Sequence, residues 1–119
     1  MNWDFVTVSG PHGPLTEGPA WDGETVLFTH IPTSRILRYD PKNGSTTDYL
    51  TNTEYANGLM FDKDGPLYAC VGNNRSVVKY ESDGSSTLLA NSFEENRLGE
   101  ASQYAHWIPP LEVVVEVFV

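Results

Sequence analysis

Short runs of alternating apolar and polar residues make up most of this chain, and turn residues separate the runs. Val, Ile, Leu, Tyr, Phe and Thr fill these runs, and no stretch sustains the 3.6-residue period of an amphipathic helix. The pattern therefore predicts an all-β chain and indicates no helix. The predicted strands cover residues 18–21, 25–29, 35–40, 46–50, 59–61, 66–71, 76–81 and 86–90.

The turns between these strands carry Asp-Gly and Asn-Gly pairs. Such pairs supply the positive φ angles that tight hairpins require, so each pair favours an antiparallel connection between its neighbouring strands. The sequence thus predicts two four-stranded antiparallel meanders. The pairs are Asp22-Gly23, Asn43-Gly44, Asp64-Gly65 and Asp83-Gly84.

The chain also repeats itself after 40 residues, because Gly-Pro-Ala-Trp-Asp at residues 18–22 returns as Gly-Leu-Met-Phe-Asp at residues 58–62. One insertion shifts the middle of the second repeat, so that residues 36–40 answer to residues 77–81. A period of this size is typical of β-propeller blades, of which a propeller has four to eight. Two repeats therefore predict an incomplete propeller. Further matches join Leu27-Phe28 with Leu67-Tyr68, Arg35 with Arg75 and Gly44-Ser45 with Gly84-Ser85.

The meander has a geometric consequence for candidate site residues. In a four-stranded antiparallel blade, the first strand starts at the same edge at which the second strand ends. Glu17 and Asn57 occupy the same position at the start of successive repeats, 40 residues apart. Since the first strand of a blade lies nearest the propeller axis, both residues are predicted to face the central channel.

Charge and composition limit the partners of this chain. It has a net charge of -9 and only seven Lys and Arg residues, whereas phosphate backbones are bound through many such side chains. No apolar run has membrane-spanning length, and Asp4 stands where a signal peptide would carry basic residues followed by an apolar block. We therefore expect a cytoplasmic protein that binds neither nucleic acid nor a membrane.

Cys70 is the only cysteine of the chain. A single cysteine excludes an intramolecular disulfide and a cysteine-based metal cluster. Its place in an apolar run favours a small buried strand residue over a nucleophile.

Several motifs together resemble the senescence marker protein, gluconolactonase and luciferin-regenerating enzyme family. They are Thr-Glu-Gly-Pro-Ala-Trp at residues 16–21, the segments 27–29 and 34–39, and Ala-Asn-Gly-Leu-Met-Phe-Asp at residues 56–62. The resemblance covers residues 14–98 and implies a six-bladed β-propeller of the lactonase type, of which residues 1–98 would form the first two blades. Many members of that family hydrolyse lactones with a divalent metal ion at the centre of the channel.

The resemblance also implies roles for individual residues. The Glu of the Glu-Gly-Pro motif is a metal ligand in the family, which assigns this role to Glu17. The Asn of the Ala-Asn-Gly-Leu motif lines the channel near the substrate, which makes Asn57 a substrate-binding candidate. Oxygen ligands suit calcium or magnesium more than zinc, so calcium is the favoured ion. The implied substrate is a small-molecule lactone.

Ordinary structural interpretations compete with these roles. Glu17 beside Gly-Pro would also suit a solvated turn residue, because charged side chains mostly face water. Asn57-Gly58 is also a common turn dipeptide. His30 follows a Phe-Thr pair where relatives often have Asp, and a lone histidine in such a loop is more often a surface or packing residue than a ligand.

The resemblance ends near Leu98, and residues 99–119 are predicted to be a divergent tail joined by a frameshift or mis-splicing. The tail replaces a third blade, and the later metal ligands of the family have no counterpart. Two ligands do not complete a calcium shell of six to eight oxygens, so we expect this chain not to be catalytically competent alone. The rival interpretations are a non-catalytic propeller binding module and a truncated product without function. Open blade edges and the apolar segment 111–119 predict self-association.

Overall fold

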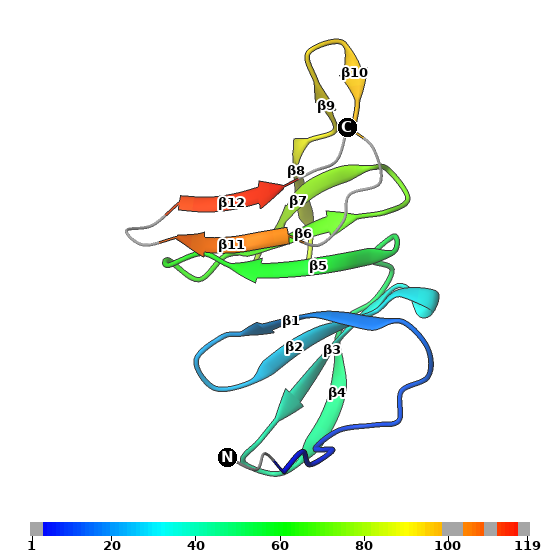
Figure 1. Cartoon of the computed structure of the whole chain (residues 1–119), viewed down its shortest axis with the longest axis vertical. Coiled ribbons are helices and arrows are strands. Elements are labelled where there is room, and N and C mark those ends of the chain that lie inside the picture. Colours follow the sequence, from blue (N-terminus) through cyan, green and yellow to red (C-terminus); the bar gives the residue numbers. More distant parts are fainter. Residues whose placement is uncertain (1–3, 99–103, 109–111, 117–119) are drawn as a thin grey trace.

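Two four-stranded antiparallel sheets dominate the computed structural model, which describes residues 4–98, 104–108 and 112–116 (Figure 1). Each sheet is a meander in chain order, which confirms the predicted all-β propeller blades. Blade 1 contains β1 (Thr16–Trp21), β2 (Val26–His30), β3 (Arg35–Asp40) and β4 (Ser45–Leu50). Blade 2 contains β5 (Ala56–Phe61), β6 (Leu67–Val71), β7 (Ser76–Tyr80) and β8 (Ser86–Ala90).

The first strand of each blade is longer than the sequence pattern predicts. β1 begins at Thr16 and β5 at Ala56, two and three residues before the predicted starts at 18 and 59. Glu17 and Asn57 are therefore strand residues and do not lie in the preceding loops. One short 3-10 turn, η1 (Ile31–Thr33), joins β2 to β3 and has Pro32 in its first turn.

The strand register corrects part of the repeat alignment. Trp21 pairs with Val26 in blade 1, whereas Phe61 pairs with Leu67 in blade 2, so the first turn of blade 2 is one residue longer. The insertion thus precedes the second strand instead of following it. The structural counterpart of Leu27 is Tyr68, not Leu67.

The same shift moves the counterpart of Arg35. Arg35 opens β3, and the residue that opens β7 is Ser76. Arg75, the sequence match, lies in the preceding turn with a φ of 51°.

The core lies between the two blades. Leu27 and Ile36 are fully buried on the face of blade 1 that packs against blade 2. Strand alternation sends Phe28 and Tyr39 to the opposite face. Burying a side chain such as Leu27 stabilises the fold by about 1.5–3 kcal/mol, so this shared core holds the two blades together. The other buried core residues are Ala20, Ala56, Leu59, Leu67, Ala69, Val71 and Val78.

Two hairpins follow blade 2. β9 (Ser92–Phe93) pairs with β10 (Asn96–Arg97), and β11 (Tyr104–Ile108) pairs with β12 (Glu112–Glu116). β11 lies against β5, on the side away from β1 (Figure 1). Part of the apolar segment 111–119 is therefore a strand, because β12 pairs with β11. The rest of the predicted tail, 99–103, 109–111 and 117–119, lies outside the described residues.

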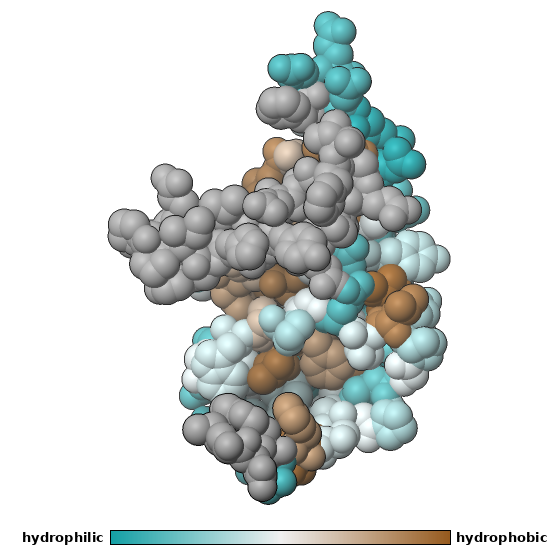
Figure 2. Space-filling model, in the orientation of Figure 1, coloured by the Kyte–Doolittle hydropathy of each residue, from teal (hydrophilic) through white to brown (hydrophobic). Residues whose placement is uncertain are grey.

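Apolar side chains also remain at the surface. Figure 2 shows brown apolar areas between hydrophilic ones on the visible face. Contiguous exposed apolar surface marks interaction sites or aggregation, so self-association stays a prediction for this chain. The large apolar residues that are exposed include Phe5, Val6, Val8, Leu15, Trp21, Leu88 and Leu89. In the described part of the chain, no helix has the length and apolarity needed to cross a bilayer.

Candidate metal and substrate site

Glu17 and Asn57 are each the second residue of the first strand in their blade. Both are half-buried. Their strands, β1 and β5, lie side by side where the two sheets meet (Figure 1). The interpretation of Asn57-Gly58 as a turn is wrong, because both residues lie inside β5. The interpretation of Glu17 as a turn residue is wrong for the same reason, since it belongs to β1.

A buried hydroxyl joins the main chains of these two residues. Thr29 on β2 has no exposed surface, and its Oγ1 lies 3.0 Å from the carbonyl oxygen of Glu17. The same Oγ1 lies 2.9 Å from the carbonyl oxygen of Asn57. One threonine hydroxyl therefore holds both predicted site residues at the same point of the blade junction.

Gly18 lets the two inner strands approach closely at this point. A Cβ atom at Gly18 would overlap with the carbonyl oxygen of Asn57. It would also lie only 3.1 Å from the Cα of Gly58. Gly18 also has a φ of 59°, which side chains other than glycine adopt at a cost. The Gly of the Glu-Gly-Pro motif is therefore required by both space and backbone conformation.

Both inner strands are irregular at the site. The pairing of β1 with β2 shifts between Glu17 and Ala20, and the pairing of β5 with β6 shifts between Ala56 and Leu59. Each shift gives the inner strand one extra residue, which is the signature of a β-bulge. Bulges re-aim side chains and interrupt regular pairing, and here they occur next to Glu17 and Asn57.

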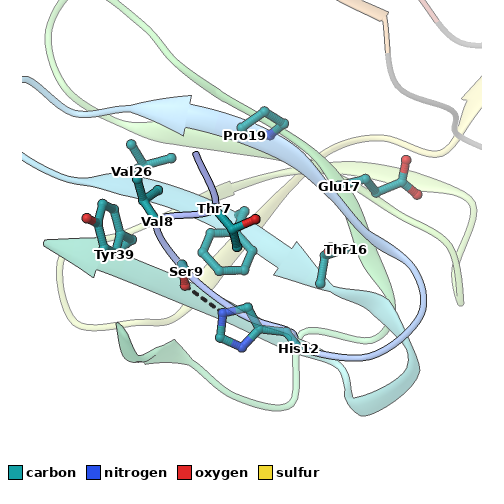
Figure 3. Close-up of a pocket in the computed structure, with 10 residues that line it drawn as sticks. Thr7, Val8, Ser9, His12, Thr16, Glu17, Pro19, Val26 and Tyr39 are labelled. Carbon is teal, nitrogen blue, oxygen red and sulfur yellow. Dashed lines mark hydrogen bonds between the residues drawn. The ribbon is translucent and has the colours of Figure 1, made fainter. Parts of the chain in front are cut away.

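The Glu17 side chain projects from β1 away from the other labelled side chains (Figure 3). Partial burial raises the pKa of its carboxyl group above the ordinary value of 4.5, since removing water disfavours the charged form. A cation bound at the carboxylate would oppose this effect.

Asn57 takes part in polar interactions of its own. Its Oδ1 accepts a hydrogen bond from the Gly58 N–H, so that oxygen is oriented by the neighbouring peptide. The arrangement holds the amide next to the strand on which it lies. Within the described ranges, no group of three or more His, Cys, Asp and Glu side chains forms a cluster for a metal ion.

The donor set is compatible with part of a hard-cation site. Glu17 supplies a carboxylate and Asn57 an amide, which are the oxygen ligands that calcium and magnesium take. Two such groups fill only part of a calcium shell. The described residues therefore offer oxygen donors of the kind such an ion takes, but not a complete set of ligands.

A pocket of about 370 Å³ lies on the other face of blade 1 (Figure 3). Phe28, Tyr39 and the candidate residue Glu17 are among the residues that line it, together with Ser9 and His12. Ser9 Oγ lies 2.6 Å from His12 Nε2, and the His12 ring packs against Phe28 with ring centroids 5.4 Å apart.

The repeat explains this pocket. Phe28 and Tyr39 correspond to Ala69 and Tyr80 of blade 2, which face blade 1 in the shared core. The pocket thus marks the face on which a neighbouring blade would pack in a ring of blades, and its lining includes the apolar side chains of Val8, Val26 and Phe28. Of the two candidate residues, Glu17 is among the lining residues of this pocket and Asn57 is not.

Other expectations for single residues can be compared with the structure. Cys70 is buried in β6, as predicted, and burial raises the pKa of its thiol, which disfavours the reactive thiolate. His30 is buried at the end of β2 and its Nδ1 lies 2.6 Å from Thr33 Oγ1, which is the geometry of a packing residue. Sequence reasoning missed Thr29, although its place beside Leu27-Phe28 in the family-like segment could have singled it out.

Comparisons with known proteins identify the family of this chain and support its fold. The profile of the SMP-30/gluconolactonase/LRE-like region matches residues 15–103. The chain belongs to this family. A gluconolactonase from Xanthomonas campestris superposes with a TM-score of 0.70 at 25% identity, over 75% of this chain and 30% of that one. The luciferin-regenerating enzyme shares the fold with a TM-score of 0.56 at 17% identity, over 83% of this chain and 36% of the enzyme.

A plant relative matches a shorter segment. Protein STRICTOSIDINE SYNTHASE-LIKE 3 of Arabidopsis thaliana is 35% identical over 69 residues, which are 52% of this chain and 18% of that protein. This family member is therefore gluconolactonase-like in sequence and fold, and it spans about a third or less of the relatives it matches.

Proposed function

We propose that this chain carries part of the active site of a metal-dependent lactone hydrolase, with Glu17 as a metal ligand and Asn57 as a substrate-binding residue. The observation that carries the proposal is that the main chains of both residues converge on Thr29 Oγ1. This oxygen lies 3.0 Å from the carbonyl oxygen of Glu17 and 2.9 Å from that of Asn57. Family membership and the gluconolactonase-like fold support the same chemistry.

The two residues have different tasks in this proposal. The Glu17 carboxylate faces the channel and binds the positively charged metal ion there. The Asn57 amide, oriented by the Gly58 N–H, offers hydrogen bonds to a neutral, oxygen-rich substrate such as a lactone. When bound, a divalent cation supplies polarisation of the lactone carbonyl and stabilisation of the developing oxyanion.

Calcium is the ion we propose, because the proposed ligand Glu17 binds through a carboxylate oxygen and not through sulfur or imidazole. Magnesium and zinc are the alternatives. Since the chain spans about a third of the solved gluconolactonase, we propose weak metal binding and no turnover for the chain by itself. Catalysis belongs to a complete ring of blades, in which further ligands complete the shell.

Calorimetric titration of the chain with CaCl₂ tests the ligand role. We expect weak binding, with a dissociation constant on the order of 10⁻³ M, that Glu17→Gln abolishes. Glu24→Gln is the matched control, because Glu24 is an exposed glutamate in the turn between β1 and β2, whose carboxylate forms an ion pair with Lys42 at 3.2 Å. Equal binding by both variants would reject Glu17 as a ligand and favour a non-catalytic binding module.

A further inference from the structure

We infer that Thr29 is a positioning residue that sets the separation of Glu17 and Asn57. The expected effect on metal binding rests on the proposed function. The geometric observations do not depend on it. Thr29 is completely buried, and its hydroxyl is within hydrogen-bond distance of two carbonyl oxygens from different blades. Those carbonyls belong to the two residues proposed to bind metal and substrate.

The chemistry of a hydroxyl makes this contact a restraint on distance. A threonine hydroxyl has one proton, so it donates to one carbonyl at a time or shares the proton between both. Either arrangement requires both oxygens to stay near the same atom. A movement of Asn57 away from Glu17 would therefore leave a buried carbonyl without this donor, which is unfavourable.

The local backbone explains why a side chain makes this contact. The pairing of β1 with β2 shifts immediately after Glu17, so the regular ladder of main-chain hydrogen bonds is interrupted there. The Thr29 side chain reaches across the interruption from β2, whose main chain is opposite Glu17. Gly18 leaves the space in which the carbonyl of Asn57 approaches.

The repeat places a different residue at the equivalent position of blade 2. The structural counterpart of Thr29 in β6 is Cys70, whose thiol is a weak donor. Cys70 has no place at the junction of the two blades, because its neighbours Ala69 and Val71 face blade 1 instead. Threonine at position 29 is thus tied to the junction that contains Glu17 and Asn57.

Three substitutions separate positioning from general packing. Thr29→Val removes the hydroxyl and keeps the shape, whereas Thr29→Ser keeps the hydroxyl. Thr53→Val is the matched control, because Thr53 is also buried and its Oγ1 has no hydrogen-bond partner among the described residues. If Thr29 has only a structural role, Thr29→Val should lower the stability of the chain and leave the separation of Glu17 and Asn57 unchanged.

The experiment combines NMR and calcium titration of the full chain. In the wild type we expect a slowly exchanging Thr29 hydroxyl proton and a nuclear Overhauser effect between the Hα atoms of Gly18 and Gly58. Thr29→Val should weaken that effect and raise the calcium dissociation constant roughly three- to tenfold, the equivalent of one lost hydrogen bond. Thr29→Ser should keep both the Gly18–Gly58 nuclear Overhauser effect and the calcium dissociation constant near their wild-type values. Thr53→Val should leave both unchanged.

The outcomes distinguish this inference from the proposed function. If the wild type binds no calcium but Thr29→Val still loses the Gly18–Gly58 signal, the metal proposal fails and the positioning role stands. If the signal and the Glu17 and Asn57 carbonyl shifts persist in folded Thr29→Val, the positioning role is overturned. Should Thr29→Val not fold, a rapidly exchanging Thr29 hydroxyl in the wild type would overturn it equally.

Discussion

The two blades share one meander but bury opposite faces. Blade 1 places Leu27, Thr29 and Ile36 against blade 2, whereas blade 2 meets blade 1 through the other face of its sheet, with Leu67 and Ala69. Repeats that are equivalent along the chain therefore have different neighbours. The difference teaches that a repeat fixes which residues share a face, while the order of the blades decides which face is buried.

The same comparison separates chemistry from scaffold. Thr29 holds the main chains of the site, and its counterpart Cys70 is only a small buried residue. Arg35 forms an ion pair with Asp48 at 2.9 Å, whereas its counterpart Ser76 is fully buried and its Oγ has no partner in the described part of the chain. Blade 1 carries the polar contacts at these positions, and blade 2 carries packing.

Gly18→Ala should break the junction between the blades most severely. The new Cβ would collide with the Asn57 carbonyl oxygen, a backbone atom that cannot turn aside. We expect a loss of about 4 kcal/mol in the free energy of unfolding, measured with urea. Gly44→Ala is the control, because its φ of 70° is similar but nothing lies within 4 Å, and it should lose about 1–2 kcal/mol. Equal losses would contradict the close approach.

Leu27→Ala should come next, because it removes a fully buried side chain from the core shared by both blades. We expect a loss of about 2–5 kcal/mol in the free energy of unfolding. Leu88→Ala, at a leucine of the outer strand of blade 2 that is 55% exposed, should change it by no more than about 0.5 kcal/mol. If the two variants unfold at the same urea concentration, the core does not lie between the blades.

Asp48→Asn tests the ion pair that blade 1 has and blade 2 lacks. Arg35 and Asp48 are 36% and 49% exposed, so solvent screens their attraction. We expect a loss of about 0.5 kcal/mol at low salt that disappears in concentrated NaCl. A loss that is the same at both salt concentrations would assign the effect of Asp48 to packing.

The smallest effect should come from the titration of Glu17. Burial raises the pKa of the Glu17 carboxyl group in the folded chain above the ordinary 4.5. The contribution of this group to the free energy of unfolding is therefore fully present below pH 4.5. Stability is then lost as the pH rises through the folded pKa, because ionisation is disfavoured in the folded chain. Glu17→Gln lacks this loss, so its stability relative to the wild type should increase with pH across this window. Urea midpoints from pH 4 to 7 measure it, and a constant difference would contradict the raised pKa.

Much of the fold could be predicted from local sequence. Asp-Gly and Asn-Gly turns and alternating residues determine hairpins through φ preferences and strand periodicity, which act over a few residues. The repeat then predicted two blades and placed Glu17 and Asn57 at equivalent positions. It misplaced the insertion, because Leu27-Phe28 and Leu67-Tyr68 look alike although their cross-strand partners differ.

The candidate site depended on tertiary contacts that no local pattern contains. By itself, the sequence determined the strands, the blades and the two residues that open them. Only the tertiary structure decided that Thr29 joins residues 12 and 28 positions away, and that Gly18 admits a backbone atom from another blade. The physical reason is that hydrogen-bond satisfaction and close packing are settled between segments distant in the chain, whereas turn and strand preferences are settled within them.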